Sequence, residues 1–344
     1  MLRQAIITGV RNPTHLVHIS SYLRTLLDER CQRLVVRWSD PERSIARFGR
    51  LSLDPTVVSR WLPDDPRLEL DLGSGAGRWR FPSDHWATHL AVGRAGLRPY
   101  AAMLAANPGR TPHVVVIDDG LASYGEPTAW LDDGSVRRPR NRPGALGRAV
   151  VELGHRAIAG DRWALYTRTA TRWQVDEQVA AEFRRRLGEV PVVDPDRVVV
   201  LSQPRGQVGP PRSRAEELDR VNHQAHIRRL VTRVRAEGKQ VVVRPHPMED
   251  PRAYDGLDVI AGVGPAELDP AVVSAAEVIG EPSTTLVNLA ALYGRRARLV
   301  APPVTGGAPV VLSQTQAELV RTFVDDPDLT CTEPMLARPV ALVA

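Results

Sequence analysis

Short apolar runs and longer segments with helical spacing alternate along the first part of the chain. Ala5 to Gly9 and Leu34 to Trp38 are apolar runs suited to buried strands. Between them a helical pattern begins at Asn12-Pro13-Thr14 and continues to Leu27, and another follows Asp40-Pro41. The order of strand, helix and strand predicts a parallel sheet with crossover helices.

The same alternation continues through the middle of the chain. An Ala- and Leu-rich pattern predicts a helix that ends near Asn107, and Val114 to Ile117 form an apolar run typical of a buried parallel strand. Helical patterns then extend to about Leu187. Residues 188–196 contain prolines and turn formers, which favour a linker between domains.

A second strand and helix series follows this linker. A strand is expected in Arg197 to Pro204, and a long helix over residues 213–237 leads to the strand Val241 to Val243. We therefore predict an α/β fold with two Rossmann-like domains, residues 1–190 and 191–344. Further strands are expected at Val259-Ile260, Val278-Ile279 and Arg298 to Ala301, with a last helix over Ala317 to Phe323 and a tail from Asp325.

Composition narrows the class of protein. The 344 residues, 43% hydrophobic and 25% charged, describe a globular chain of two domains. A net charge of +5 suits an anionic ligand or an anionic membrane surface better than nucleic acid. The two cysteines, Cys31 and Cys331, provide neither a disulfide framework nor metal-ligand spacing. We expect a cytoplasmic protein without nucleic-acid partners, whose basic surface suits peripheral association with the inner face of the membrane.

A histidine between two prolines ends the strand Val241 to Val243. The sequence Arg244-Pro245-His246-Pro247 stops the strand abruptly and leaves an imidazole and a guanidinium at its carboxyl end. Ligands of open α/β sheets bind at this edge. The alternative is an exposed loop histidine without a role in chemistry.

Two adjacent carboxylates follow the strand Val114 to Ile117. Asp118 and Asp119 precede Gly120, and neighbours on an extended chain point to opposite sides. One carboxylate can face a cleft while the other anchors the loop. A desolvated carboxylate beside another negative charge has a raised pKa, which suits a general base. The alternative is an ordinary Asp-Gly turn.

Hydroxyl residues begin the helical pattern after Glu281-Pro282. Ser283 is a good N-cap, and Thr284 and Thr285 fall in the first turn, where amide groups favour an anion such as phosphate. The alternative is capping alone. Gly9 raises a similar choice, because it permits either the close approach of a ligand to the backbone or a plain tight turn.

A glycine-rich stretch, Leu68 to Gly77, resembles the loop that follows the first strand of S-adenosylmethionine-dependent methyltransferases. Those proteins need a second strand that ends in an acidic residue roughly 20 residues later. Here we expect a helix instead. A single glycine-rich turn is a weak signal, so a methyltransferase is a minor alternative.

The three sets of residues together resemble the signature motifs of bacterial sialyltransferases. Asp118-Asp119-Gly120 is similar to the acidic motif, His246-Pro247 to the His-Pro motif and Ser283-Thr284-Thr285 to the Ser-Ser/Thr motif, most of all as found in bacterial polysialyltransferases. Gly9 with Asn12 to His15, and Leu201 to Pro204 with Ser202 and Gln203, also look like segments of that group. The resemblance implies a GT-B fold, in which two Rossmann-like domains face each other across a central cleft.

The resemblance also implies a reaction and the roles of the residues. The donor would be a CMP-activated sialic acid or related nonulosonic acid, transferred with inversion and without a metal or cofactor to a glycan or glycolipid. Asp118 or Asp119, with Asp119 favoured, would be the base, and His246 the acid toward the leaving group. The remaining donor-binding candidates are Gly9, Ser202, Gln203, Arg244, Pro247, Glu267 for the ribose, Ser283, Thr284 and Thr285.

A second family also uses a GT-B fold and a His-Pro motif, namely the CDP-glycerol glycerophosphotransferases. Glu281-Pro282-Ser283 is a partial match to the acidic signature that this family would need. Such a glycerophosphotransferase is the leading alternative to a sialyltransferase, and a nucleotide-binding protein without catalysis is a third class.

Overall fold

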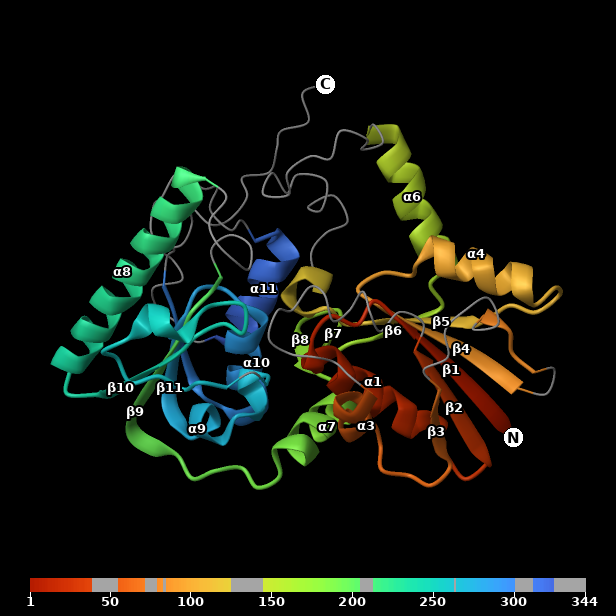
Figure 1. Ribbon diagram of the computed structural model, residues 1–344, viewed down its shortest axis with the longest axis horizontal. Coiled ribbons are helices and arrows are strands. Elements are labelled where there is room, and N and C mark those ends of the chain that lie inside the picture. The colour runs from red at the N-terminus through yellow and green to blue at the C-terminus, as the bar shows by residue number, and fades with distance from the viewer. Residues whose placement is uncertain are drawn as a thin grey trace. The chain divides into compact units, whose positions relative to one another are not determined.

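The computed structural model describes residues 1–38, 55–71, 79–82, 85–124, 145–204, 213–262, 264–300 and 312–324. The chain divides into two compact units, coloured along the sequence in Figure 1. The first unit comprises residues 1–119, 141–167 and 174–182, and the second comprises 120–140, 168–173 and 183–344. Each unit has its own parallel sheet among the described residues. The prediction of an α/β fold with two Rossmann-like units is therefore confirmed.

The boundary expected near residue 190 falls within an irregular stretch. Residues 188–193 lie between α7 (Glu177–Leu187) and β9 (Asp194–Leu201), and Val192 is 91% exposed. The compact units divide the chain slightly earlier, at residues 182 and 183, and they also exchange the short segments 120–140 and 168–173. A single cut between domains 1–190 and 191–344 stays a prediction.

The first unit is built on a six-stranded sheet. Its order is β3-β2-β1-β4-β5-β6, and every pair of neighbouring strands is parallel. The connections build outward from β1 in one direction and then from β4 in the other, so the order reverses between β1 and β4. Ligands of such sheets bind at the carboxyl ends of the strands at this reversal. The strands are β1 (Leu2–Thr8), β2 (Arg33–Trp38), β3 (Leu68–Asp71), β4 (His85–Val92), β5 (His113–Ile117) and β6 (Asp161–Trp163).

Alternation along β1 divides the core of the first unit between the two faces of the sheet. Ala5 and Ile7 pack in the cluster that includes Leu16 and Ile19 of α1 (Pro13–Leu26), whereas Ile6 packs with Met103 of α4 (Leu97–Ala106). Because β1 is covered on both faces, its central residues Ala5, Ile6 and Ile7 are all apolar. The other helices of this unit are α3 (Pro55–Trp61), α6 (Ala145–Ile158) and most of α7.

The second unit is built on a four-stranded parallel sheet of order β10-β9-β11-β12. Its order reverses between β9 and β11. Valines of β9 and β10 pack against the apolar face of α8 and against the fully buried Tyr254. The elements are β10 (Gln240–Arg244), β11 (Ala275–Gly280), β12 (Arg296–Leu299), α8 (Arg214–Ala236), α9 (Pro270–Val273), α10 (Thr284–Tyr293), α11 (Gln314–Phe323), and the 3-10 helices η3 (Pro251–Tyr254) and η4 (Ala266–Leu268).

The structure corrects several predicted elements. The helix expected to end near Asn107 is β4 followed by α4, because the run His85–Val92 is a strand buried between β1 and β5. Short apolar runs do not distinguish a buried strand from a helix. The helical patterns expected before Leu187 also contain three-residue strands, namely β6, β7 (Tyr166–Arg168) and β8 (Trp173–Val175). Val259 forms only an isolated bridge to Val243.

Other predicted elements agree with the structure, and some lie outside the described residues. The helices over Pro13–Leu26 and Arg214–Ala236 and the strands at Ala275–Gly280 and Arg296–Leu299 are confirmed. Three predicted segments lie outside the described residues, namely the start of the helix expected after Asp40-Pro41, the glycine-rich residues 72–78 and the tail from Asp325. No helix among the described residues is both long and apolar enough to cross a membrane.

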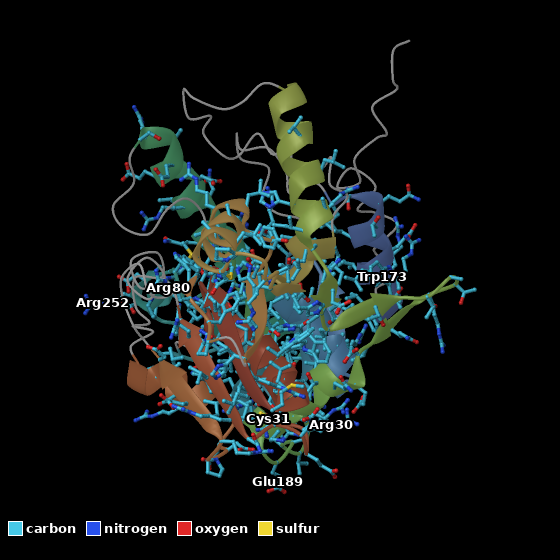
Figure 2. All side chains as sticks on the ribbon, turned by 90° about the vertical axis from the view of Figure 1, so that its right-hand side faces the viewer. Arg30, Cys31, Arg80, Trp173, Glu189 and Arg252 are labelled. Atoms are coloured by element: carbon cyan, nitrogen blue, oxygen red, sulfur yellow. The ribbon has the colours of Figure 1, made fainter. Side chains whose placement is uncertain are left out.

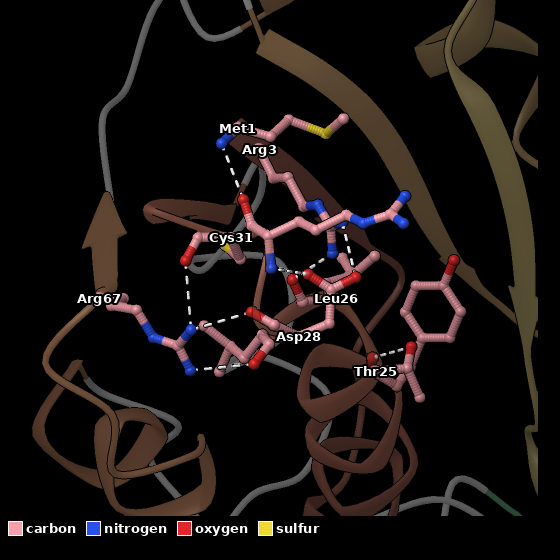
Figure 3. Close-up of polar contacts among 10 residues, drawn as sticks. Met1, Arg3, Thr25, Leu26, Asp28, Cys31 and Arg67 are labelled. Carbon is pink, nitrogen blue, oxygen red and sulfur yellow. Dashed lines mark hydrogen bonds and ion pairs between the residues drawn. The ribbon is translucent and has the colours of Figure 1, made fainter.

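Two arginines hold the amino edge of the first sheet (Figure 3). Arg67 donates to the carbonyls of Leu27 at 2.9 Å and Cys31 at 3.1 Å, and Arg3 donates to the carboxylate of Asp28 at 2.9 Å. These bonds satisfy the carbonyls and the turn that follow the carboxyl end of α1. Cys31 is buried at this edge, and its neighbour Arg30 is exposed (Figure 2). The end of α1 is therefore fixed here, and its start lies at the carboxyl edge of the sheet.

Candidate active site

Two glycines bring the chain close together at the reversal of the first sheet. Gly9 follows β1 with φ of +79°, and a Cβ added to it would lie 3.3 Å from the carbonyl oxygen of Val92. Gly93 follows β4 with φ of +73°, and a Cβ added there would lie 3.1 Å from Oδ2 of Asp119. Only glycine adopts this backbone without strain. The carboxylate of Asp119 therefore rests against bare backbone at the carboxyl edge.

A histidine at the start of α1 contacts the same carboxylate. Asn12 caps the helix by accepting the backbone N–H of His15 at 3.0 Å. Nε2 of the buried His15 lies 2.6 Å from Oδ1 of Asp119, and Nδ1 accepts the backbone N–H of Arg11 at 3.1 Å. Because Nδ1 accepts a hydrogen bond, the proton of the neutral imidazole resides on Nε2. His15 therefore donates to Asp119.

This hydrogen bond sets the charge of Asp119. Burial raises the pKa of Asp119, but the hydrogen bond from His15 and the positive charge of Arg11 oppose burial, and that pKa lies below its ordinary value. The raised pKa that the paired carboxylates led us to expect is therefore wrong for Asp119, because the helix start supplies a donor. The carboxylate is ionised at neutral pH, with Oδ2 beside Gly93.

Asp118 occupies a different environment from Asp119. Its side chain is 2% exposed, and its backbone N–H donates to the carbonyl of Trp163 at 3.0 Å. Its charge acts on His18, one turn along α1 from His15. Burial lowers the pKa of His18 to about 4 despite this neighbour. The two adjacent carboxylates thus act on two different histidines of one helix, and Asp119 is the more exposed of the two.

His246 follows β10 in the second unit, within a closed turn. Its backbone N–H donates to Oε2 of Glu249 at 2.9 Å, and the backbone N–H of Met248 donates to its Nδ1 at 3.2 Å. The neutral imidazole therefore carries its proton on Nε2. Burial lowers the pKa of His246 to about 4, so the ring is neutral at pH 7.

Arg244 is buried directly before this turn. Its guanidinium donates to the carbonyls of Ile260 at 3.0 Å and Gly264 at 2.8 Å, and it lies 3.6 Å from the carboxylate of Asp269. Burial lowers its pKa from the ordinary value. These contacts tie the carboxyl end of β10 to the following loop. Pro247 lies after His246 in the turn and is half-buried.

The start of α10 holds three predicted hydroxyl residues, each with a contact of its own within the second unit. Ser283 is the N-cap and accepts the backbone N–H of Leu286 at 3.3 Å. Thr284 Oγ1 accepts the backbone N–H of Leu121 at 2.7 Å. Thr285 hydrogen-bonds to the side chain of Glu267. The first amides of a helix, here those of Thr284 and Thr285, have no acceptor in a preceding turn of the helix, which favours an anion there.

Glu267 lies behind this helix start. It is 2% exposed, its Oε1 accepts the side-chain N–H of Asn288 at 2.9 Å, and its backbone carbonyl accepts the hydroxyl of Tyr293 at 2.9 Å. Burial raises the pKa of Glu267, although the hydrogen bonds from Asn288 and Thr285 oppose this. The described contacts of Glu267 therefore hold α10 from within.

Ser202 and Gln203 follow β9, at the reversal of the second sheet. Ser202 is 3% exposed, and its hydroxyl lies 3.0 Å from Nε2 of His223 and 2.6 Å from the hydroxyl of Tyr254. Gln203 is half-buried. Across this reversal, Gly280 ends β11 so close to β9 that an added Cβ would lie 3.2 Å from Cβ of Leu201. Ser202 is thus part of a buried network.

Sequence reasoning missed several residues of these edges. From the sequence, His15 is considered only as part of a segment, and no chemistry is assigned to Glu249, Tyr254 or His223. The single available signal was an Asn cap three residues before His15. The glycine-rich residues 72–78 lie outside the described residues and follow β3, an edge strand away from the reversal. Among the described residues, no group of three or more His, Cys, Asp or Glu side chains is arranged to hold a metal ion.

Comparisons with known proteins identify similar folds. No family model and no curated protein sequence matches this chain. The E. coli heptosyltransferase WaaC with ADP is 13% identical, with 88% of each chain covered and a TM-score of 0.37. The GT-B domain of a sialyltransferase from Photobacterium damselae is 11% identical, covering 96% of this chain and 98% of that chain, with a TM-score of 0.42.

A putative UDP-N-acetylglucosamine 2-epimerase from Listeria monocytogenes is also similar, at 11% identity and a TM-score of 0.41, covering 87% of this chain and 79% of that chain. The similar structures thus include a heptosyltransferase and the GT-B domain of a sialyltransferase. At these identities and TM-scores, neither the donor nor the acceptor of this chain follows from them.

Proposed function

We propose that this chain is an inverting, metal-independent glycosyltransferase that moves sialic acid or a related nonulosonic acid from a CMP-activated donor to a glycan or glycolipid. The observation that carries the proposal is the ionised Asp119 at the reversal of the first sheet, hydrogen-bonded to His15. The three ordered motifs and the glycosyltransferases among the similar folds support it. A basic net charge of +5 suits an acceptor at the inner face of a membrane.

Asp119 would be the general base. Its carboxylate, held through Oδ1 by His15, would take the proton of the acceptor hydroxyl. The acceptor oxygen would form a bond to the anomeric carbon as the bond from that carbon to the phosphate oxygen breaks, and the electron pair would leave with CMP. Asp118, which is almost fully buried, would support the loop.

His246 would stabilise the leaving phosphate as a neutral hydrogen-bond donor. Its Nδ1 accepts an amide hydrogen and its pKa is lowered to about 4, so the group that it offers at pH 7 is Nε2–H. This role is narrower than the proton donor that the resemblance implies. A CMP leaving group carries its charge on phosphate, and donors directed at that charge lower the barrier.

The start of α10 would bind the same phosphate. Ser283 and Thr284 each accept a backbone N–H, so each hydroxyl hydrogen is still able to donate to an anion. Gln203 and Pro247 would line the donor site, and Glu267 remains the proposed ribose contact. Gly9 would let a ligand approach the backbone at the edge of the first sheet. Arg244 and Ser202 would act by holding the ends of β10 and β9 in place.

A thermal-shift panel of CMP, CDP, UMP, UDP and S-adenosylhomocysteine tests the proposal. A ligand that binds only the folded protein raises Tm. We expect the largest shift with CMP, followed by release of CMP from CMP-sialic acid when a glycan acceptor is added. A larger shift with CDP would favour the glycerophosphotransferase, and a shift with S-adenosylhomocysteine alone would favour the methyltransferase.

A further inference from the structure

Glu249 connects the turn of His246 to the interior of the second unit. Its Oε2 accepts the backbone N–H of His246 at 2.9 Å, and its Oε1 accepts the hydroxyl of Tyr254 at 2.9 Å. The backbone N–H of Glu249 also donates to the carbonyl of His246 at 2.8 Å. One residue therefore closes the turn through its backbone and through both carboxylate oxygens.

The network behind Glu249 has a definite direction. Because Tyr254 donates its hydrogen to Glu249, the hydroxyl of Ser202, 2.6 Å away, must donate to Tyr254. Ser202 then accepts from Nε2 of His223, at 3.0 Å. Tyr254 is 0% exposed, and His223 and Ser202 are 2% and 3% exposed. A buried network whose donors and acceptors are matched in this way is rigid.

We infer that Glu249 is a positioning residue for His246, and that Tyr254, Ser202 and His223 fix Glu249 in turn. The contact reaches the backbone of His246, so it orients the turn and does not exchange a proton with the imidazole. The turn that Glu249 closes contains Met248, whose amide occupies Nδ1 of His246 and thereby keeps the ring proton on Nε2. The predicted effect of Glu249 on turnover rests on the proposed function. Its predicted effect on the tautomer of His246 does not.

The first readout is the ring itself, observed in the ligand-free protein. Nitrogen chemical shifts of ring-labelled histidine report which nitrogen carries the proton, with His246→Ala used for assignment. In the wild type we expect a protonated Nε2 for His246. In Glu249→Ala we expect a mixture of tautomers, because the Met248 amide is no longer held against Nδ1. An unchanged Nε2–H tautomer in Glu249→Ala would overturn the inference whether or not the protein transfers a sugar.

The second readout is a double-mutant cycle on turnover per folded molecule. Glu249→Ala should lower kcat about 10- to 100-fold in the wild-type background and should lower it no further in His246→Ala, since coupled residues are not additive. Equal factors in both backgrounds would show a general structural role and contradict the inference. Absence of CMP release by the wild type would instead refute the proposed function and leave the ring measurement as the test.

Two further variants guard against misfolding. Tyr254→Phe keeps the ring that fills the core but removes the hydroxyl that holds Glu249, so we expect a smaller loss of kcat, about 3- to 10-fold, with the same dependence on His246. Glu277→Gln is the matched control, because Glu277 is a buried carboxylate of the same unit paired with Arg298 at 2.7 Å, on β11. Its kcat should match the wild type. A loss of kcat in Glu277→Gln equal to that in Tyr254→Phe would overturn the inference.

Discussion

The carboxyl edges of the two sheets each hold a histidine in the same tautomer, but among the described residues only His15 has a hydrogen-bond partner at Nε2. Nδ1 of His15 accepts the amide of Arg11, and Nδ1 of His246 accepts the amide of Met248. Nε2 of His15 donates to Asp119, whereas none of the described residues hydrogen-bonds to Nε2 of His246. One imidazole holds a carboxylate, and in the proposed function the other would offer its N–H to the leaving phosphate.

The difference indicates two separate tasks. A carboxylate with an internal donor stays ionised, as a base requires. A neutral imidazole with its proton on Nε2 presents a hydrogen-bond donor, as a departing phosphate requires. If this comparison is correct, substitutions at the site of the first unit should affect deprotonation of the acceptor through the charge of Asp119. Substitutions at the site of the second unit should affect stabilisation of the leaving phosphate.

The largest effect should follow removal of the imidazole of His246, the proposed hydrogen-bond donor to the leaving phosphate. His246→Ala should lower kcat about 10²- to 10⁴-fold, the usual loss for a group that acts on a proton or charge in the transition state, with a smaller loss of donor binding. The control is His113→Ala, which removes an imidazole paired with the exposed Asp161. Steady-state kinetics with correctly folded protein measures this loss. An unchanged kcat in His246→Ala would mean that His246 is a structural residue.

The next effect should follow displacement of the carboxylate. In Gly93→Ala the added Cβ would lie 3.1 Å from Oδ2 of Asp119, and a shift of about 1 Å can cost roughly 10²-fold in kcat. Gly109→Ala is the matched control, because Gly109 has a similar φ of +75° but nothing within 4 Å of an added Cβ. Both variants should lose about 1–2 kcal/mol of unfolding free energy from the left-handed backbone. Equal kcat values for Gly93→Ala and Gly109→Ala would mean that the position of Asp119 does not affect catalysis.

A smaller effect should follow loss of the donor to Asp119. His15→Ala removes the hydrogen bond that lowers the pKa of Asp119, so that pKa should rise and the acid limb of the pH–rate profile should move to higher pH. At neutral pH kcat should fall about tenfold, the scale of one hydrogen bond to a charged group. In His15→Gln the side-chain amide can donate to Asp119, so this variant should restore part of the lowered pKa of Asp119 and part of kcat. An acid limb that does not move in His15→Ala would exclude Asp119 as its source.

A further prediction concerns stability in acid and leaves kcat aside. Burial lowers the pKa of His18 and His89 from 6.5 to about 4, so between these values the unfolded chain binds protons that the folded chain does not. Unfolding free energy should therefore decrease as pH falls from 6.5 toward 4, by up to about 1.4 kcal/mol per pH unit for each histidine. Urea titrations at several pH values should show a shallower slope for His89→Asn. An equal slope would mean that His89 is protonated in the folded protein.

The sequence was sufficient for the fold where a pattern was long or flanked by clear caps. The helices Pro13–Leu26 and Arg214–Ala236 begin at Asn12 and Ser213, which cap them as their residue types predict. The strand His85–Val92 was missed because Ala, Leu and His give no periodicity that separates a short buried strand from a helix. Its place between β1 and β5 is a property of the whole sheet.

The candidate site residues were predictable from the sequence, but their pKa values and hydrogen-bond partners were not. Asp119 and His246 stand out in the sequence because they follow short apolar runs. The lowered pKa of Asp119 depends on His15, 104 residues earlier in the chain, and the network behind Glu249 joins segments from Ser202 to Tyr254. No local pattern encodes such contacts between distant residues, which arise only when the sheets form.

Calorimetric titration of CMP into two variants tests the division of tasks most directly. Asp119→Asn should lower kcat and leave the Kd of CMP nearly unchanged, because its interaction is made only in the transition state. Ser283→Ala with Thr284→Ala should weaken CMP by about 0.5–1.5 kcal/mol for each lost hydrogen bond. Ser313→Ala, which removes the equivalent cap of α11, controls for capping alone. Loss of CMP binding in Asp119→Asn with unchanged binding in the double variant would contradict the account.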